Sequence, residues 1–281
     1  MRAGKLSVFV LAMLLAAPLL AQGDDLGAWL SVGVDKRIAK GLSADIEAEY
    51  RLQDHLHQTD RWAVGASLSY RLYRNKAKTF DVKADAGAKL MRLYVPANMV
   101  MKDSVFVWDE LLDNDVFKGQ EYNVDDAYTV SKFRATASVS ASVEAGRFKI
   151  SLRERYQYTG NDSVAVTERK WRYSGKDGQV AERPDKADTE WKAANNRRHV
   201  LRSRLQLDYN IPNCKVDPYV SAELFNDLRD GFSLQKIRYL GGLEYKLNKV
   251  HQFKLYYAYQ HNSDDDEPGG HIVGLSYGYS F

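Results

Sequence analysis

The tripeptide His261-Asn262-Ser263 has the residue types of a hydrolytic site. Residues two apart on an extended strand share a face, so the imidazole of His261 and the hydroxyl of Ser263 are expected to lie together. A histidine beside a serine can act as the base that activates the hydroxyl as a nucleophile. The alternation of Tyr257 and Tyr259 places both side chains on an apolar strand face. The same face of the next strand supplies no acid to orient the histidine; it carries Val273, Leu275, Tyr277 and Tyr279.

Charged side chains of both signs form a second set of candidates, on the polar faces of alternating segments. They are Glu47, Glu49, Arg51, Arg71, Glu144, Arg153, Arg155, Arg202, Arg204, Asp208, Glu223 and Glu244. Inside a narrow closed barrel such charges must pair or contact water. They are interpreted either as a salt-bridged network that stiffens the barrel or as a polar conduit that selects small charged or zwitterionic solutes. No residue spacing decides between these two interpretations.

A long polar connection between Glu168 and Arg198 combines cationic side chains with tryptophan. Its candidate binding residues are Arg169, Lys170, Trp171, Arg172 and Trp191. Such a surface can bind the phosphates of lipopolysaccharide or another anionic glycan. A solvated, mobile loop is the alternative interpretation.

The run Asp264, Asp265 and Asp266 is the one candidate for a metal site. Clustered carboxylates can bind a divalent cation. Their spacing matches no defined calcium loop, so a solvated hairpin tip is the expectation. The sequence indicates no cofactor.

Alternation of apolar and polar residues predicts the elements that position these side chains. It is strict at 42–52, 62–72 and 133–145, shorter at 148–155, 201–209 and 253–259, and weaker at 26–37, 79–94, 216–226 and 234–247. Segments of about ten residues let tilted strands cross a membrane, whereas soluble sandwich strands are usually about 5–6 residues long. We therefore predict an all-β fold, a transmembrane antiparallel β-barrel.

Residues 271–281 are predicted to close this barrel. Apolar and aromatic residues alternate there with Gly and Ser, and the terminal Phe281 predicts recognition by the barrel-assembly machinery. The candidate strands number eleven with this segment, but antiparallel closure needs an even number. We expect about 12 strands, with about 10 as the alternative and residues 99–108 as a hidden strand. Short connections such as 146–147 and 210–215 are expected in the periplasm, and the long ones, 94–130 and 159–198, outside the cell.

The N-terminal segment predicts export. Arg2 and Lys5 precede an apolar run, residues 6–20, and small residues follow at Ala21 and Gly23, as in a secretory signal peptide. Residues 1–23 are expected to be cleaved, which leaves 24–281 as a single barrel domain. The formal net charge is only +3, and two of these charges lie in the leader. That balance argues against a nucleic-acid partner.

Several stretches taken in order resemble a known family. They are 60–62 (DRW) leading into 68–70 (LSY), 151–159 (SLRERYQYT), 199–206 (HVLRSRLQ), 218–224 (PYVSAEL), 242–246 (GLEYK) and 261–277. Together they resemble an uncharacterised family of outer-membrane barrels, a domain of unknown function found in Bacteroides-type Gram-negative bacteria. The resemblance implies the barrel and the cell outer membrane, in contact with its lipid and lipopolysaccharide. It implies no activity and no catalytic residue.

Three functions are compatible with the sequence. The first is a narrow pore or an envelope-stabilising barrel with a charged lumen. The second is a lipid A or phospholipid acyl hydrolase that uses His261 and Ser263, because the His-x-Ser pattern resembles that of lipid A deacylases. The third is a surface ligand-binding or adhesion barrel that acts through its long loops. The missing acid near His261 favours the first.

Overall fold

The computed structural model describes residues 25–174, 180–182, 187–193, 197–262 and 269–281. The predicted signal peptide, Ser263 and the three aspartates Asp264, Asp265 and Asp266 lie outside the described residues. In the described ranges no helix is long and apolar enough to cross a membrane. The chain divides into two compact units, one of which contains residues 93–131 and 161–195.

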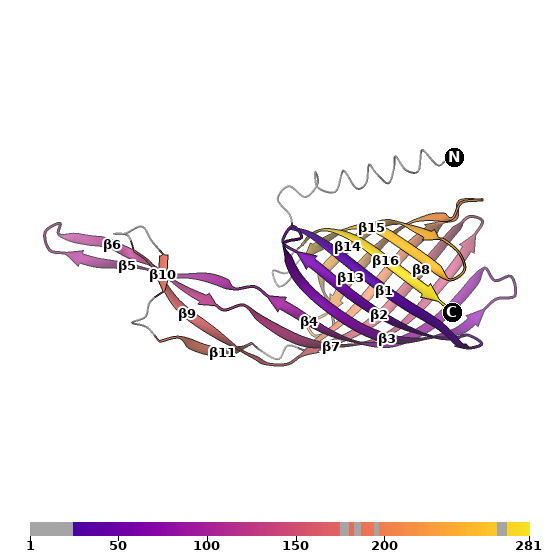
Figure 1. Ribbon diagram of the computed structural model, residues 1–281, viewed down its shortest axis with the longest axis horizontal. Helices are drawn as coiled ribbons and strands as arrows, with labels where there is room; N and C mark the ends of the chain where they lie inside the picture. The colour runs from indigo at the N-terminus through magenta and orange to yellow at the C-terminus, as the bar shows by residue number, and fades with distance from the viewer. Residues whose placement is uncertain (1–24, 175–179, 183–186, 194–196, 263–268) are drawn as a thin grey trace. The chain divides into compact units, whose positions relative to one another are not determined.

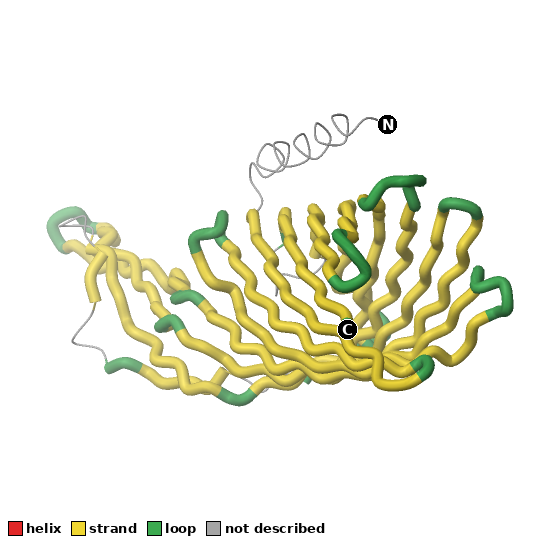
Figure 2. The backbone as a smooth tube through the Cα atoms, turned by 45° about the vertical axis from the view of Figure 1, so that its right-hand side comes forward, coloured by secondary structure: helices red, strands yellow, loops and turns green. Residues whose placement is uncertain are grey.

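The larger unit is a closed β-barrel, as predicted. Its strands are β1 (Asp25–Ala39), β2 (Leu42–Gln53), β3 (Gln58–Arg74), β4 (Phe80–Val95), β7 (Tyr128–Ala145), β8 (Phe148–Asn161), β12 (Arg198–Tyr209), β13 (Val216–Asp227), β14 (Ser233–Lys246), β15 (His251–Asn262) and β16 (Gly270–Ser280). Around the barrel they follow the order β1-β16-β15-β14-β13-β12-β8-β7-β4-β3-β2. Figure 1 shows β16, β1, β2 and β3 side by side in that order, and Figure 2 shows the connecting segments at the strand ends.

The barrel has eleven strands, so the expectation of twelve, or of ten, is wrong. The even-number rule assumes antiparallel closure, but β1 and β16 pair in parallel, from Asp25 opposite Gly270 to Asp35 opposite Ser280. Neighbouring pairs such as β1–β2 and β15–β16 are antiparallel. The segment 26–37 is therefore a full strand, and no hidden strand is needed.

Short turns gather at one end of the barrel. Gly146 and Arg147 alone join β7 to β8, and Gly146 has a φ of +63°, in the left-handed region that favours glycine. Phe281 lies at this end too, because its N–H donates to Asp35 O (3.1 Å) and its carbonyl accepts from Arg37 N (3.3 Å). Since β1 runs parallel to β16, Asp25 lies at the opposite end.

The second unit is a five-stranded sheet. Its strands are β5 (Asn98–Asp109), β6 (Asn114–Asp125), β9 (Val164–Ser174), β10 (Val180–Glu182) and β11 (Thr189–Ala193). They follow the order β10-β9-β6-β5, and β11 also pairs with β9. The long connections 94–130 and 159–198 are thus largely strands rather than loops. Residues 99–108 form most of β5, outside the barrel.

An apolar belt surrounds the barrel. Every barrel strand exposes a large apolar side chain on its outward face, and one example from each strand is 38–64% exposed: Val32, Ile46, Val64, Leu90, Val139, Ile150, Leu205, Val220, Tyr239, Phe253 and Leu275. The inward faces carry small and charged residues instead. A closed barrel that is apolar outside and polar inside has the arrangement expected of a barrel that spans a membrane.

Candidate functional site

Among the described residues, polar cavities of about 820 Å³ and about 600 Å³ lie in the barrel lumen. The larger one reaches Gly146, Arg147 and Asn210 at the short-turn end. The smaller one lies against Trp29 and Glu223. Both cavities share a partition lined by Ser67, Thr136, Arg153, Arg155, Arg204, Gln206, Glu244 and Lys254.

Most of the charged residues expected on the inward face line these cavities. Glu144 and Asp208 line the larger cavity, and Arg153, Arg155, Arg204 and Glu244 line both. The smaller cavity alone is lined by Glu47, Glu49, Arg51, Arg202 and Glu223. Arg71 lines neither cavity; its Nε lies 2.9 Å from a carboxylate oxygen of Asp81 on the neighbouring strand β4.

Glu223 is the centre of the ionic network. The side chain belongs to β13 and the residue is 5% exposed. Arg202 Nη2 lies 3.0 Å from both of its carboxylate oxygens, Arg153 Nη2 lies 3.1 Å from Oε1, and Arg238 Nη1 lies 3.7 Å from Oε2. We call these four residues the Glu223 cluster. Since charged donors converge on one buried carboxylate from three strands, the cluster ties β8, β12, β13 and β14 together.

Aromatic rings fill the lumen beside the Glu223 cluster. The guanidinium carbon of Arg51 lies 3.7 Å from the centroid of the Trp29 ring, and that of Arg238 lies 4.7 Å from it. The guanidinium carbons of Arg202 and Arg238 lie 4.6 Å and 5.0 Å from the centroid of the Phe225 ring. These are cation–π distances. Trp29 was not among the predicted residues. The sequence signal that could have identified it is a large aromatic residue among the small and polar residues on the inward face of β1.

Buried polar side chains close the lumen toward the end where β1 begins. Gln157, Thr159, Asp227 and Gln260 are inward-facing and only 7–9% exposed. Gln260 Oε1 accepts hydrogen bonds from Arg238 at 3.2 Å and 2.6 Å, and Arg202 Nη1 donates to Gln157 Oε1 at 3.0 Å. Hydrogen-bonded polar side chains therefore gather at one end of the lumen, whereas the larger cavity extends to the turns at the other.

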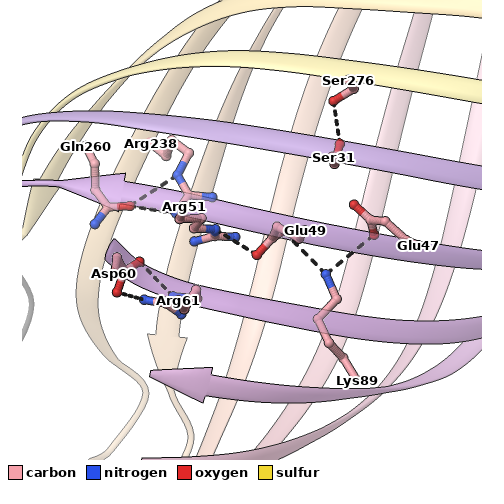
Figure 3. Close-up of polar contacts among 10 residues, drawn as sticks. All are labelled: Ser31, Glu47, Glu49, Arg51, Asp60, Arg61, Lys89, Arg238, Gln260 and Ser276. Carbon is pink, nitrogen blue, oxygen red and sulfur yellow. Dashed lines mark hydrogen bonds and ion pairs between the residues drawn. The ribbon is translucent and has the colours of Figure 1, made fainter. Parts of the chain in front are cut away.

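The acidic face of β2 has its own partners (Figure 3). Arg51 Nε lies 2.7 Å from Glu49, and Lys89 Nζ lies 3.4 Å from both Glu47 and Glu49. Ser31 Oγ donates to Ser276 Oγ at 2.7 Å across the parallel β1–β16 pair. These contacts hold β2 to β4 and close the barrel from the inside.

Glycines on the inward face of β14 and β16 make room for tyrosine rings. A Cβ added at Gly274 would overlap the ring of Tyr256 on the neighbouring strand β15. A Cβ at Gly242 would lie 2.8 Å from Tyr256 Cβ and 2.9 Å from Tyr219 Cζ. Tyr219 and Tyr256 both line the smaller cavity, so these glycines set its shape.

We predict that Gly274→Val destabilises the barrel. The added side chain would push the Tyr256 ring off the wall, and overpacking of this kind costs about 1–3 kcal/mol. The temperature at which folded barrel converts to the unfolded band in gel electrophoresis measures the effect. Gly278→Val on the same strand face is the matched control, because a Cβ there meets only Gln252, at 3.9 Å. Equal transition temperatures for the two variants would contradict the prediction.

The outward face around His261 is aromatic. His261 lies near the end of β15 and is exposed, while Ser263 lies outside the described residues. On the neighbouring strand β16, His271 is 6% exposed, shares a hydrogen bond with the hydroxyl of Tyr257, and packs 5.1 Å from the centroid of Tyr259. His271 was not among the predicted residues. The described residues of β16 on this face include no acid.

A carboxylate lies on the outward face of β8. Glu154 shares that face with Ile150, Leu152 and Tyr156, because the alternate residues of β8 line the lumen. Ser203 of β12 donates to Glu154 Oε2 at 2.6 Å. Neither Glu154 nor Ser203 was among the predicted residues. The sequence signal that could have identified the pair is Glu154 itself, a single acid in a series of apolar residues at alternate positions.

The basic residues of the second unit are paired within its sheet. Arg169 Nη2 lies 3.1 Å from Asp126, Arg172 Nη2 lies 2.6 Å from Glu121, and Lys170 pairs with Glu168. The hydrogen bond from Lys170 lowers the pKa of Glu168. Trp191 Nε1 donates to Asp125 (3.0 Å), and Trp171 lies opposite Tyr122 in the β6–β9 register. The cations that were candidates for binding an anionic glycan therefore contact acids of the same unit.

Comparison with known proteins gives a family and a fold neighbour. The family model described as "Protein of unknown function (DUF2490)" matches residues 26–269. The beta domain of the Bordetella autotransporter Brka is similar at 12% sequence identity and a TM-score of 0.45, over 87% of this chain and 86% of that chain. No curated protein matches the sequence.

Proposed function

The chain belongs to the DUF2490 family, and we propose that it is an outer-membrane β-barrel of a Gram-negative bacterium whose charged lumen forms a narrow, gated pore for small polar solutes. The observation that carries this proposal is the contrast between the two faces of the barrel wall. All eleven strands expose apolar side chains outward, whereas the inward faces enclose two charged cavities. The apolar outward face is suited to contact with lipid, and the charged inward face is suited to contact with water.

The gate in this proposal is the Glu223 cluster with Trp29 and Phe225. These groups fill the lumen toward the end where β1 begins, while the larger cavity reaches the short turns, which we assign to the periplasm. A solute entering from the short-turn end meets the partition and then the smaller cavity. Passage beyond it requires Arg51 and Arg238 to leave the Trp29 ring. If the Glu223 cluster never opens, the protein acts instead as an envelope-stabilising barrel.

Planar-bilayer recording of the refolded chain tests the pore. We expect small, infrequent openings for the wild type and a several-fold larger mean conductance for Trp29→Ala, because this variant removes the ring under Arg51 and Arg238. Trp62→Ala is the matched control, since Trp62 is 51% exposed on the outward face of β3. No conductance above the lipid baseline for wild type and Trp29→Ala, in several salts, would remove the pore.

A further inference from the structure

Four arginines form a block on the inward face of two neighbouring strands. Arg153 and Arg155 belong to β8, and Arg202 and Arg204 to β12. The antiparallel register places Arg202 directly opposite Arg155 and Arg204 directly opposite Arg153. Like charges at directly opposite positions destabilise a sheet. The block therefore needs anionic compensation.

Glu223 lies directly opposite Arg204 in the β12–β13 register, but its carboxylate contacts only one diagonal of this arginine block. It contacts Arg153 and Arg202. On the other diagonal, Arg204 Nη2 donates to the neutral Gln206 Oε1 at 2.6 Å, and the guanidinium of Arg155 makes no hydrogen bond or ion pair with a described side chain. The two residues share the partition between the cavities.

Other lumen cations nearby have carboxylate partners. Arg51 pairs with Glu49 at 2.7 Å and Lys254 with Glu244 at 3.3 Å. Asp85, one of two acids of β4 in the larger cavity, accepts a hydrogen bond from Ser138 at 3.3 Å and forms no ion pair within the described ranges. Within the arginine block, the guanidinium groups of Arg155 and Arg204 are therefore the two that contact no carboxylate of a described residue.

We propose that Arg155 and Arg204 form a binding site for an oxyanion, the phosphate or carboxylate group of a small solute in the lumen. Guanidinium groups bind both oxyanions with two parallel hydrogen bonds. Diagonal residues of an antiparallel pair lie about 7–8 Å apart, so two long arginine side chains reach one anion between them. Cavities of about 600 and about 820 Å³ have the size of small-molecule sites.

The location gives the site a consequence for selectivity. It lies at the partition, so every solute that moves between the cavities passes it. Thr136 of the neighbouring strand β7 lines both cavities too. This inference rests on the proposed function for its route of access, and it names the class of solute that the lumen retains. A bound anion also relieves the repulsion within the arginine block.

The test uses inorganic phosphate as the probe, with acetate as the carboxylate arm. Isothermal titration of the full refolded chain in detergent is expected to show phosphate binding, weakened at least tenfold in Arg155→Gln/Arg204→Gln. Phosphate should raise the thermal transition of the wild type but not of this variant, because a ligand stabilises only the state that binds it. Without phosphate, the variant should unfold at a higher temperature than the wild type, since the opposed like charges are gone.

Lys83→Gln/Lys149→Gln is the matched control. It removes the same number of positive charges from the larger cavity but leaves the arginine block intact, so phosphate binding should equal that of the wild type. Equal binding by the arginine variant and the wild type would overturn the proposal, as would equal loss in the control or no binding of phosphate and acetate by the wild type. Binding of both anions indicates any oxyanion, and binding of phosphate alone indicates phosphorylated solutes.

Bilayer recording of the same samples separates this proposal from the pore. Conductance without anion binding would remove the site and leave the pore. Anion binding in a barrel that never conducts would remove the pore and leave the arginines as a closed binding site.

Discussion

Glu223→Gln is expected to lower the thermal transition of the folded barrel and to raise its conductance. The substitution keeps the shape of the side chain but removes the charge that three arginines share at 3.0–3.7 Å. Removing one partner of a buried ion pair costs about 3–5 kcal/mol, because the remaining charge stays buried without compensation. Water in the adjoining cavity brings the expected loss to about 3 kcal/mol, the lower end of that range. Gel-shift melting and planar-bilayer recording measure the two effects.

The conductance change follows from the same repulsion. Arg153, Arg202 and Arg238 lose their common anion, so their guanidinium groups should separate and open the filled end of the lumen. The enlarged path carries more positive charge and should favour anions over cations. Glu144→Gln is the matched control, because Glu144 lines the larger cavity, is exposed and has no ion pair with a described residue. If both variants melt and conduct as the wild type does, the Glu223 cluster is neither the tie nor the gate.

Alternation alone was enough to predict the barrel and much of its inward face. In segments such as 42–52 and 62–72, one residue in two is apolar, and the structure places these apolar residues outside. The period fixes which side chains share a face but not which strands are neighbours. The expected number of strands was therefore wrong, because it depends on a long-range pairing, the parallel pairing of β1 with β16. No local pattern encodes that choice.

The second sheet escaped prediction because its strands break the period. The register of β5 against β6 shifts between Met101 and Ser104 and again between Val105 and Phe106. Each such irregularity exchanges the two faces of a strand. β10 has only three residues and β11 five, too few for alternation to register. The polar composition of these segments then resembled that of loops.

The candidate site was predictable residue by residue but not as a set. The sequence placed Arg153, Arg155, Arg202 and Arg204 on inward faces. It did not give the offset of β8 against β12, because 36 residues separate the two strands. Only that offset makes Arg155 oppose Arg202, and only the third strand β13 brings Glu223 beside the arginines, directly opposite Arg204. The assembly of this cluster depends on the register of three strands.

Ile46→Arg is expected to prevent stable folding in a bilayer. Ile46 is 60% exposed on the outward face of β2 and pairs with Val34 and Ala66. The pairs Leu42–Tyr70 and Tyr50–Trp62 lie four residues to either side, so Ile46 stands midway between two levels of aromatic side chains. Such aromatics mark the two membrane interfaces, and an arginine at the midplane costs about 2–4 kcal/mol. Urea titration of folding in phospholipid vesicles measures the loss.

Ser140→Arg is the matched control for the added charge. Ser140 faces the larger cavity from β7, where a new guanidinium finds water and neighbouring carboxylates. We expect its folding to differ little from that of the wild type.

The two variants distinguish a membrane barrel from a water-soluble one, because the expected effect of Ile46→Arg on stability is opposite in the two cases. In water, an arginine in place of the exposed Ile46 removes apolar surface from solvent, which is neutral or favourable. In lipid the same change buries a charge in hydrocarbon. A folded Ile46→Arg chain as stable as Ser140→Arg would therefore mean that the apolar belt does not face lipid.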